Sequence, residues 1–199
     1  MIKIVFLIEA LIIIGCNSKP QPVTKLTEEE YDIYSTIISH RFGILLRLPK
    51  DSNDTLYLSS KTSAFDIVGK GIKIKYSLYD AYAFPVDTLK SFYPLQDWDS
   101  LVTQFKYVTK DSVNIDPSKL NSSFKYSLIK GNIFMTPNII GFSRVGFNTQ
   151  RDKALVYYFT GEIETVNEYV LLLEKKNNHW EIVGGYGAEH GMMKGFRYY

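Results

Sequence analysis

Cysteine, histidine and clustered basic residues are scarce in this sequence, and each shortage disfavours a class of function. The 199 residues include one cysteine, Cys16, so no disulfide can form within the chain. Glu189 and His190 are adjacent, but with only His40 and His179 elsewhere the sequence does not support a metal site. The net charge of +2 arises without a concentrated Lys/Arg run, which argues against nucleic-acid binding.

Recognisable catalytic motifs are missing as well. The hydroxyl residues at positions 59, 60, 62 and 63 stand outside any GxSxG pattern, so we interpret them as strand-end and turn residues. Gly184–Gly191 is glycine-rich, but no GK[ST] follows it, so it is not a phosphate-binding loop. We therefore predict no catalytic residue and no cofactor.

The composition is that of a globular chain. Apolar residues make up 45% and charged residues 22%, and the length allows one domain. The 15 tyrosines and 12 phenylalanines would suit a sugar- or partner-binding face, because tyrosine combines an apolar ring with a polar hydroxyl. We prefer a simpler interpretation of the high aromatic content. Tyrosine is usually partly buried in folded proteins, and its codons are common in AT-rich genomes.

An apolar run near the start of the chain ends at the only cysteine. Lys3 precedes the run Ile4–Ile14, which is shorter than the ~20 residues of a membrane-spanning helix and fits the apolar region of a secretory signal peptide. Gly15 and Cys16 follow, and this ending resembles the lipobox of bacterial lipoproteins. The resemblance implies lipidation: a diacylglycerol on the Cys16 sulfur and usually a third acyl chain on its amine, enough to anchor the chain stably.

Two positions depart from the lipobox pattern. Ile13 stands where leucine is usual, and Glu9 lies inside the apolar run. An ordinary cleaved signal peptide or a short uncleaved anchor therefore stays open as an alternative. On the lipoprotein interpretation, residues 1–15 are the signal peptide and residues 16–26 are an extended tether. In enteric bacteria, an aspartate directly after the lipidated cysteine retains a lipoprotein in the inner membrane. This chain has Asn17 there, which favours an outer membrane, if the organism has one.

Helix signals dominate the first half of the domain. Thr27 and Glu30 have the spacing of a capping box, and apolar residues then recur every three or four positions, which predicts a helix over Glu28–Arg41. A second short helix is predicted over Asp97–Phe105. Alternation predicts a strand over Thr55–Ser60.

Strand signals dominate the second half. A tight turn is predicted over Lys176–His179. Short connections require antiparallel neighbours, so we expect an antiparallel meander. The predicted strands are Ile139–Phe147, Lys153–Phe159, Tyr169–Leu173 and Trp180–Val183.

The resulting fold class is α+β, with an antiparallel C-terminal meander packed against N-terminal helices. A cystatin-like or NTF2-like arrangement is conceivable from the order of helix and meander alone. The domain is expected over residues 27–185, followed by a flexible glycine-rich C-terminal tail over residues 186–199.

Several strings in the chain resemble one family of proteins. They are SRVGFN (Ser143–Asn148), ALVYY (Ala154–Tyr158), YVLLLEKKNNHWEIV (Tyr169–Val183) and, upstream, YDIYSTII (Tyr31–Ile38). Together they resemble a family of uncharacterised bacterial secreted proteins and lipoproteins over most of the chain after Cys16. The resemblance implies architecture and location, not chemistry. Members often carry a Gly/Cys-rich segment where this chain has Gly161–Glu168 without cysteine.

Two functional hypotheses follow. The preferred one is a membrane-anchored envelope module that binds a protein or glycan partner. Arg144 and Asn148 are its candidate ligand-binding residues, because they could bind carboxylate or phosphate, although an Arg144–glutamate pair across the sheet is the structural alternative. The other hypothesis is an envelope hydrolase with its site in the concave face of the sheet. Its candidates are Arg144, His179, Glu181 and His190.

Overall fold

The computed structural model describes most of the chain from residue 25 onwards. The described residues are 25–42, 55–62, 65–68, 71–74, 84–85, 90, 98–110, 112–122, 124–130, 139–162, 165–189 and 192–197. The predicted features at Cys16, Asp97 and His190 lie outside these ranges.

Two helices, one short 3₁₀ turn and eleven strands make up the described fold, which is α+β as predicted. The helices are α1 (Glu28–Phe42) and α3 (Trp98–Val108), and the 3₁₀ turn is η1 (Pro117–Lys119). The strands are β1 (Thr55–Ser59), β2 (Phe65–Val68), β3 (Gly71–Ile74), β4 (Phe84–Pro85), β5 (Lys125–Ile129), β6 (Ile139–Phe142), β7 (Gly146–Phe147), β8 (Lys153–Glu162), β9 (Thr165–Lys176), β10 (His179–Glu189) and β11 (Met192–Arg197).

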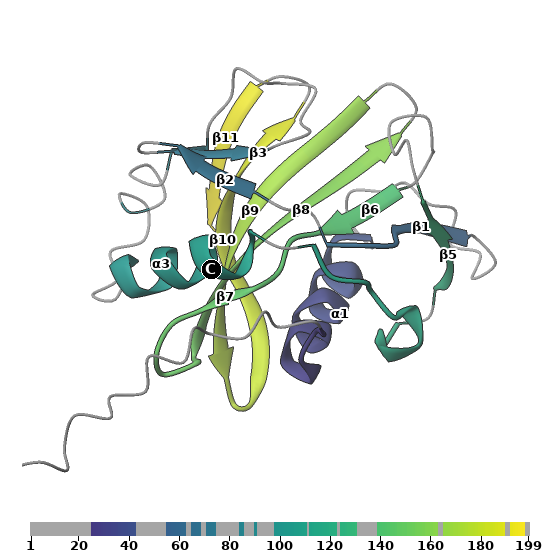
Figure 1. Ribbon diagram of the computed structural model, residues 1–199, viewed down its shortest axis with the longest axis horizontal. Coiled ribbons are helices and arrows are strands. Elements are labelled where there is room, and N and C mark those ends of the chain that lie inside the picture. Colours follow the sequence, from purple (N-terminus) through teal and green to yellow (C-terminus); the bar gives the residue numbers. More distant parts are fainter. Residues whose placement is uncertain are drawn as a thin grey trace, which may run out of the picture.

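The main sheet has the strand order β11-β10-β9-β8-β6-β1-β5, with β7 also pairing with β8 (Figure 1). From β6 to β11 the neighbours are antiparallel, which confirms the predicted meander. The other end differs, because β1 pairs parallel to both β5 and β6. The long stretches of chain between these strands permit such parallel pairing.

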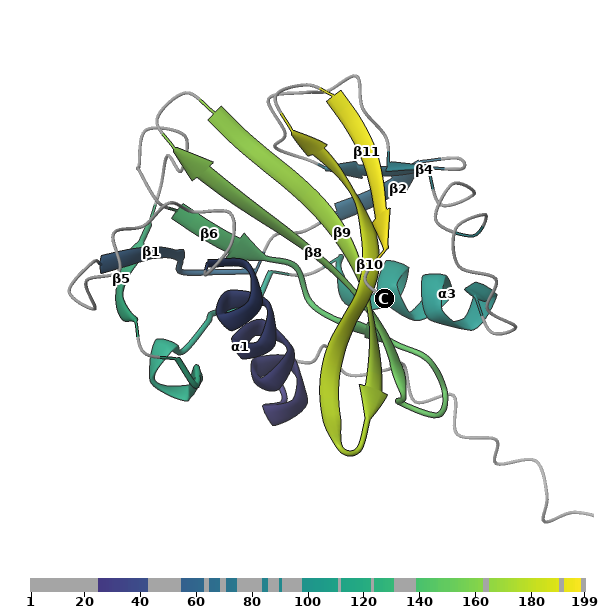
Figure 2. The same ribbon diagram turned by 180° about the vertical axis from the view of Figure 1, so that it is seen from behind.

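The sheet is covered on both faces. Helix α1 lies on one face, while α3 and the small antiparallel sheet β2-β3-β4 lie towards the other (Figures 1 and 2). Alternate residues of β8 show the result: Ala154, Val156 and Tyr158 belong to the core beneath α1, and the intervening Leu155 and Tyr157 are also buried. Strand β8 is therefore a central strand covered on both faces, as its continuous apolar run predicts.

Helix α1 begins where the capping-box pattern places it. The Thr27 backbone N–H donates to Glu30 Oε2 (2.9 Å), and the Glu30 N–H donates to Thr27 Oγ1 (3.2 Å). On the core side of the helix, Tyr34 stacks on Phe142 with ring centroids 4.5 Å apart and donates its hydroxyl to the Ser143 carbonyl (2.7 Å). These contacts fix the rotation of α1 on the sheet, so its opposite face is also fixed.

The predicted strand Ile139–Phe147 is divided in two by a bulge. Phe142 pairs with Tyr158 and Gly146 pairs with Leu155, so three residues of this strand face two residues of β8. The extra residue resets the alternation of side chains. Phe147 consequently packs in the core beneath α1 together with Phe142. The bulge also places Arg144 in the interior, where it is 5% exposed.

The described residues of the tail predicted for residues 186–199, which are 186–189 and 192–197, are instead part of the sheet. Strand β10 continues to Glu189. Residues Gly184–Glu189 of this strand pair antiparallel with Met192–Arg197 of β11. Gly187 follows from packing and not from flexibility: a Cβ at this position would lie 2.3 Å from the Tyr169 ring and 2.9 Å from the Glu168 carbonyl. The α+β class is thus established, while a cystatin-like or NTF2-like arrangement stays a prediction.

Candidate functional site

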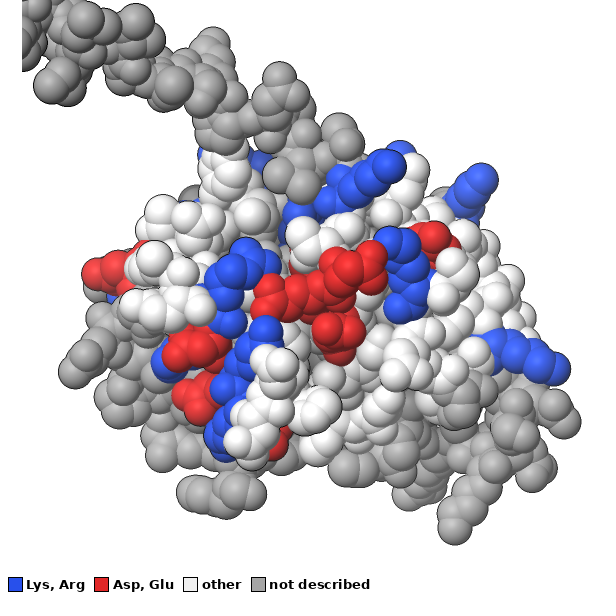
Figure 3. Space-filling view, turned by 90° about the horizontal axis from the view of Figure 1, so that it is seen from below, with Lys and Arg blue, Asp and Glu red and all other residues white. Residues whose placement is uncertain are grey.

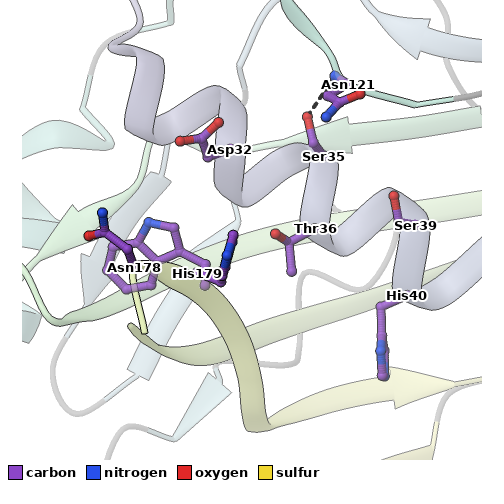
Figure 4. Close-up of a pocket in the computed structure, with 9 residues that line it drawn as sticks. Asp32, Ser35, Thr36, Ser39, His40, Asn121, Asn178 and His179 are labelled. Atoms are coloured by element: carbon purple, nitrogen blue, oxygen red, sulfur yellow. Dashed lines mark hydrogen bonds between the residues drawn. The ribbon is translucent and has the colours of Figure 1, made fainter. Parts of the chain in front are cut away.

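A groove of about 780 Å³ lies between the outer face of α1 and the tip of the β9–β10 hairpin (Figure 4). We refer to it as the helix–hairpin groove. Its volume is within the usual range for small-molecule sites. The lining residues are Asp32, Ser35, Thr36, Ser39, His40, Asn121, Asn178, His179 and Trp180.

The helix wall of the groove is a stripe of polar residues. Asp32, Ser35, Thr36, Ser39 and His40 recur at spacings of three, one, three and one, so they share a face of α1. This stripe points away from the buried apolar face of the same helix. Asp32 and Ser39 are exposed, whereas Ser35 is buried.

Ser35 connects the helix wall to the end of the groove at Asn121. Its Oγ donates to the Tyr31 carbonyl (2.7 Å) and accepts the Asn121 backbone N–H (2.9 Å) (Figure 4). The Asn121 main chain is therefore held against the helix. The Asn121 side chain itself is exposed at the groove.

The hairpin wall owes its position to a two-residue turn. Asn177 and Asn178 both have positive φ (48° and 67°), and His179 pairs with Lys176 across the turn. Two positive-φ residues in a two-residue loop are the geometry of the favoured hairpin turns. The Asn178 and His179 side chains are exposed on this wall, facing α1 (Figure 4).

Trp180 forms the buried part of the hairpin wall. It is 6% exposed, and its ring centroid lies 5.7 Å from that of Phe147. The Lys175 Nζ lies 5.5 Å from the Trp180 ring. The indole Nε1–H is buried and has no hydrogen-bond acceptor among the residues that the structure describes.

A network of charges joins α1 to the hairpin beside the groove. Glu29 accepts hydrogen bonds from Lys175 Nζ (2.9 Å) and from Arg151 Nε (2.9 Å). Burial raises the pKa of Glu29, but these two cationic partners outweigh it and hold the pKa below the ordinary value of a glutamate. Figure 3 shows acidic and basic side chains interleaved on this face, so the network does not form a patch of one sign.

Arg144, a predicted ligand-binding candidate, is engaged inside the protein. Its Nε donates to Glu30 Oε1 (2.6 Å) and its Nη2 to Glu30 Oε2 (3.1 Å), with both side chains nearly fully buried. Glu30 Oε1 also accepts the Val145 N–H (3.2 Å). The structure thus realises the glutamate pairing that the sequence offered as an alternative, with the difference that the glutamate comes from a helix.

Asn148, the second candidate, holds the turn before β8. Its Oδ1 accepts the backbone N–H groups of Asp152 (3.1 Å) and Lys153 (3.0 Å), and its Nδ2 donates to Asp152 Oδ1 (2.7 Å). This last hydrogen bond is the main reason that the pKa of Asp152 is lowered. Asn148 is 3% exposed and does not line the helix–hairpin groove.

The three described candidates of the hydrolase hypothesis are not brought together. His179 lines the groove, Arg144 is buried against Glu30, and Glu181 is exposed with its Oε2 3.2 Å from Lys176 Nζ. The structure instead places His40 with His179 on the groove. In the view of Figure 4 the Thr36 side chain lies between the two imidazoles. Among the described residues, no cluster of three or more His, Cys, Asp or Glu side chains could hold a metal ion.

A second buried polar pair lies beneath the opposite face of the sheet. Tyr157 donates its hydroxyl to Glu168 Oε1 (2.9 Å), and both residues are buried. Burial, reinforced by the Glu168 carboxylate, raises the pKa of Tyr157 far above its ordinary value, so the phenol stays protonated. The hydrogen bond pairs two polar groups that would otherwise be buried without each other as partners.

Sequence reasoning missed most of the groove. Of its lining residues, only His179 was a functional candidate, while Asp32, Thr36, Asn178 and Trp180 were not. The signal that could have found the groove was the spacing of polar residues along the predicted helix. This spacing places them on one face of the helix, opposite its apolar face. No family model, curated protein or solved structure matches the chain. Neither described helix is long and apolar enough to cross a membrane.

Proposed function

We propose that this chain is a lipid-anchored module of the bacterial cell envelope that binds a partner without transforming it. The observation that carries the anchor is the placement of the only cysteine, Cys16, directly after Gly15 at the end of an apolar run. The similarity of the strings quoted above to bacterial secreted proteins and lipoproteins supports the same location. An outer membrane is the proposed site where the organism has one.

The binding role is supported by the helix–hairpin groove. The groove is open to solvent, and the Glu29–Lys175 ion pair joins α1 to the hairpin that forms the opposite wall. Its lining carries hydrogen-bonding groups, and no metal-binding cluster is found among the described residues. A fixed concave surface with a few convergent polar groups is the usual form of a ligand site.

The anchor is tested by intact mass and membrane fractionation of the protein from its native host, beside Cys16→Ser. The expected wild-type mass is that of residues 16–199 plus acyl chains, in the membrane fraction. Cys16→Ser should lack the acyl mass and leave that fraction. Unchanged mass and unchanged fractionation of the variant would refute the anchor.

A hydrolase is the second candidate, and one observation favours it. Asp32, His40 and His179 line the same groove as several hydroxyl groups, and histidine is the commonest general acid or base. Products released from an envelope polymer by wild-type protein, and not by His179→Gln, would establish this candidate. Equal release by both, or none by either, would remove it.

A further inference from the structure

The lining of the helix–hairpin groove restricts the charge of its ligand. Asp32 is the one carboxylate, and among the described residues no lysine or arginine lines the groove. A phosphate or carboxylate ligand would therefore meet a negative side chain without the cationic fork that usually binds such groups. The remaining polar groups are amides, hydroxyls and imidazoles, which match uncharged donors and acceptors.

The lining also excludes a predominantly apolar ligand. Hydrophobic helices and acyl chains bind in grooves with wide apolar floors. Trp180 is the one large apolar side chain of this groove, and only 6% of its surface is exposed. Hydrogen bonding must therefore supply most of the recognition, together with the edge of one aromatic group.

We propose that the helix–hairpin groove binds a neutral, linear glycan. This proposal rests on the binding role proposed above and names the class of its ligand. Sugar hydroxyls both donate and accept hydrogen bonds, as do the Asn121 and Asn178 amides and the Thr36 and Ser39 hydroxyls. The Asp32 carboxylate accepts two sugar hydroxyls without requiring a charged ligand.

Trp180 supplies an independent observation. Its Nε1–H is buried and has no acceptor among the described residues, and a buried donor without an acceptor is destabilising. Trp180 lines the groove, and a small shift of the groove floor would let a ligand oxygen accept from this enclosed donor. A glycan offers several such oxygens, and its C–H groups suit an aromatic side chain.

The walls of the groove are fixed before any ligand arrives. The Ser35–Asn121 hydrogen bond holds one end, and the Glu29–Lys175 ion pair holds the hairpin to α1. The Asn178 backbone is set by its positive φ. A site whose polar groups are already placed loses less entropy on binding, which matters for a weak, polar ligand such as a sugar chain.

The experiment uses the full-length protein in detergent, labelled with ¹⁵N at its two indole groups. The chain has only Trp98 and Trp180, so Trp98→Phe assigns the Trp180 signal. The neutral probes are β-1,4-linked hexasaccharides of N-acetylglucosamine and of glucose, and hexagalacturonate is the anionic control. The matched variants are Asn178→Gly and Asn177→Gly. Glycine accepts the positive φ of both positions, but only Asn178 lines the groove.

We expect at least one neutral hexasaccharide to shift the Trp180 indole signal saturably, and hexagalacturonate not to do so. Asn178→Gly should raise its Kd about fivefold, the effect of losing one hydrogen bond of average strength. Asn177→Gly should leave Kd within about twofold. The proposal is overturned if no neutral probe shifts the signal, if hexagalacturonate binds as tightly, or if the two glycine variants weaken binding equally.

The outcomes separate this proposal from the function on which it rests. A lipidated, membrane-bound protein that ignores every neutral probe would keep the anchored module and reject the glycan. Shortening of a hexasaccharide during the titration would keep the glycan as ligand and reject the non-enzymatic role. Saturable binding by a chain that is not lipidated would keep the glycan and reject the anchor.

Discussion

Replacing Glu30 by glutamine should destabilise the protein severely, because Glu30 neutralises Arg144 in the interior. The two side chains are 1% and 6% exposed, and two guanidinium hydrogen bonds join them (2.6 and 3.1 Å). Removing one partner of a buried pair leaves the other charge uncompensated, which costs about 3–5 kcal/mol. Glutamine can still accept the Thr27 backbone N–H, so the capping box is kept and the loss is assigned to the charge.

The assay is urea unfolding followed by tryptophan fluorescence. With a slope of about 1–3 kcal/mol per molar urea, the expected loss lowers the midpoint by roughly 2 M. Glu28→Gln is the matched control, since it lies two residues away in the same helical turn. Its partner Lys119 and Glu28 itself are largely exposed, so this change should cost less than about 1 kcal/mol.

A double variant isolates the effect of the buried charge. Arg144→Met removes the buried cation, so Glu30→Gln with Arg144→Met should lose less free energy of unfolding than the two single changes summed, by about 1 kcal/mol or more. If Glu30→Gln alone does not fold, a double variant that does fold would still show that the uncompensated Arg144 charge causes the loss. A midpoint for Glu30→Gln equal to that of Glu28→Gln would refute the assignment of a buried, uncompensated charge.

Three further changes test other parts of the fold by the same unfolding assay. Gly146→Ala should cost about 1–3 kcal/mol or more, because its Cβ would lie 2.4 Å from the Phe105 Cα, and an unchanged midpoint would contradict that contact. Asn148→Ala should cost about 1–2 kcal/mol through two partly buried N–H groups left without their acceptor, whereas the exposed Thr149→Ala should cost less than about 0.5 kcal/mol; equal losses would contradict this role. The lowered pKa of Glu29 contributes stability above about pH 4–5 that is lost as the pH falls through the folded pKa, so the stability difference between wild type and Glu29→Gln should shrink on acidification. A difference that stays constant from pH 7 to pH 3 would contradict the shift.

The elements that depend on local signals are predictable from the sequence. The capping box at Thr27 and Glu30 fixes the start of α1, and the Asn177–Asn178 turn fixes the β9–β10 hairpin, because each depends on residues within four positions of one another. The continuous apolar run of β8 similarly indicates burial on both faces. These features require no knowledge of which segments meet in space.

The features that sequence reasoning missed depend on distant partners. The strand Ile139–Phe147 is broken because Arg144 must reach Glu30, more than a hundred positions away. The parallel pairing of β1 with β5 and β6 likewise joins segments far apart in the chain. The C-terminal strands were mistaken for a tail because glycine suggests flexibility, whereas Gly187 is required by the ring of Tyr169.

The candidate groove was hidden for the same reason, and the three glutamates at the start of α1 show how. In the sequence they suit the helix dipole. In the structure each binds a different part of the chain: Glu28 binds Lys119 in η1, Glu30 binds Arg144 in the bulge, and Glu29 binds both Arg151 and Lys175. One helical turn thus docks α1 onto the segments around it.

That docking defines the groove. Rotation of α1 is fixed by Glu30 beneath it and by Tyr34 against the sheet, so the polar stripe from Asp32 to His40 can only face outward. The Glu29–Lys175 pair then sets the distance from this stripe to the hairpin that carries Asn178. The polar stripe on α1 therefore becomes one wall of a defined site because ion pairs of neighbouring residues, Glu30 with Arg144 and Glu29 with Lys175, hold the helix in place.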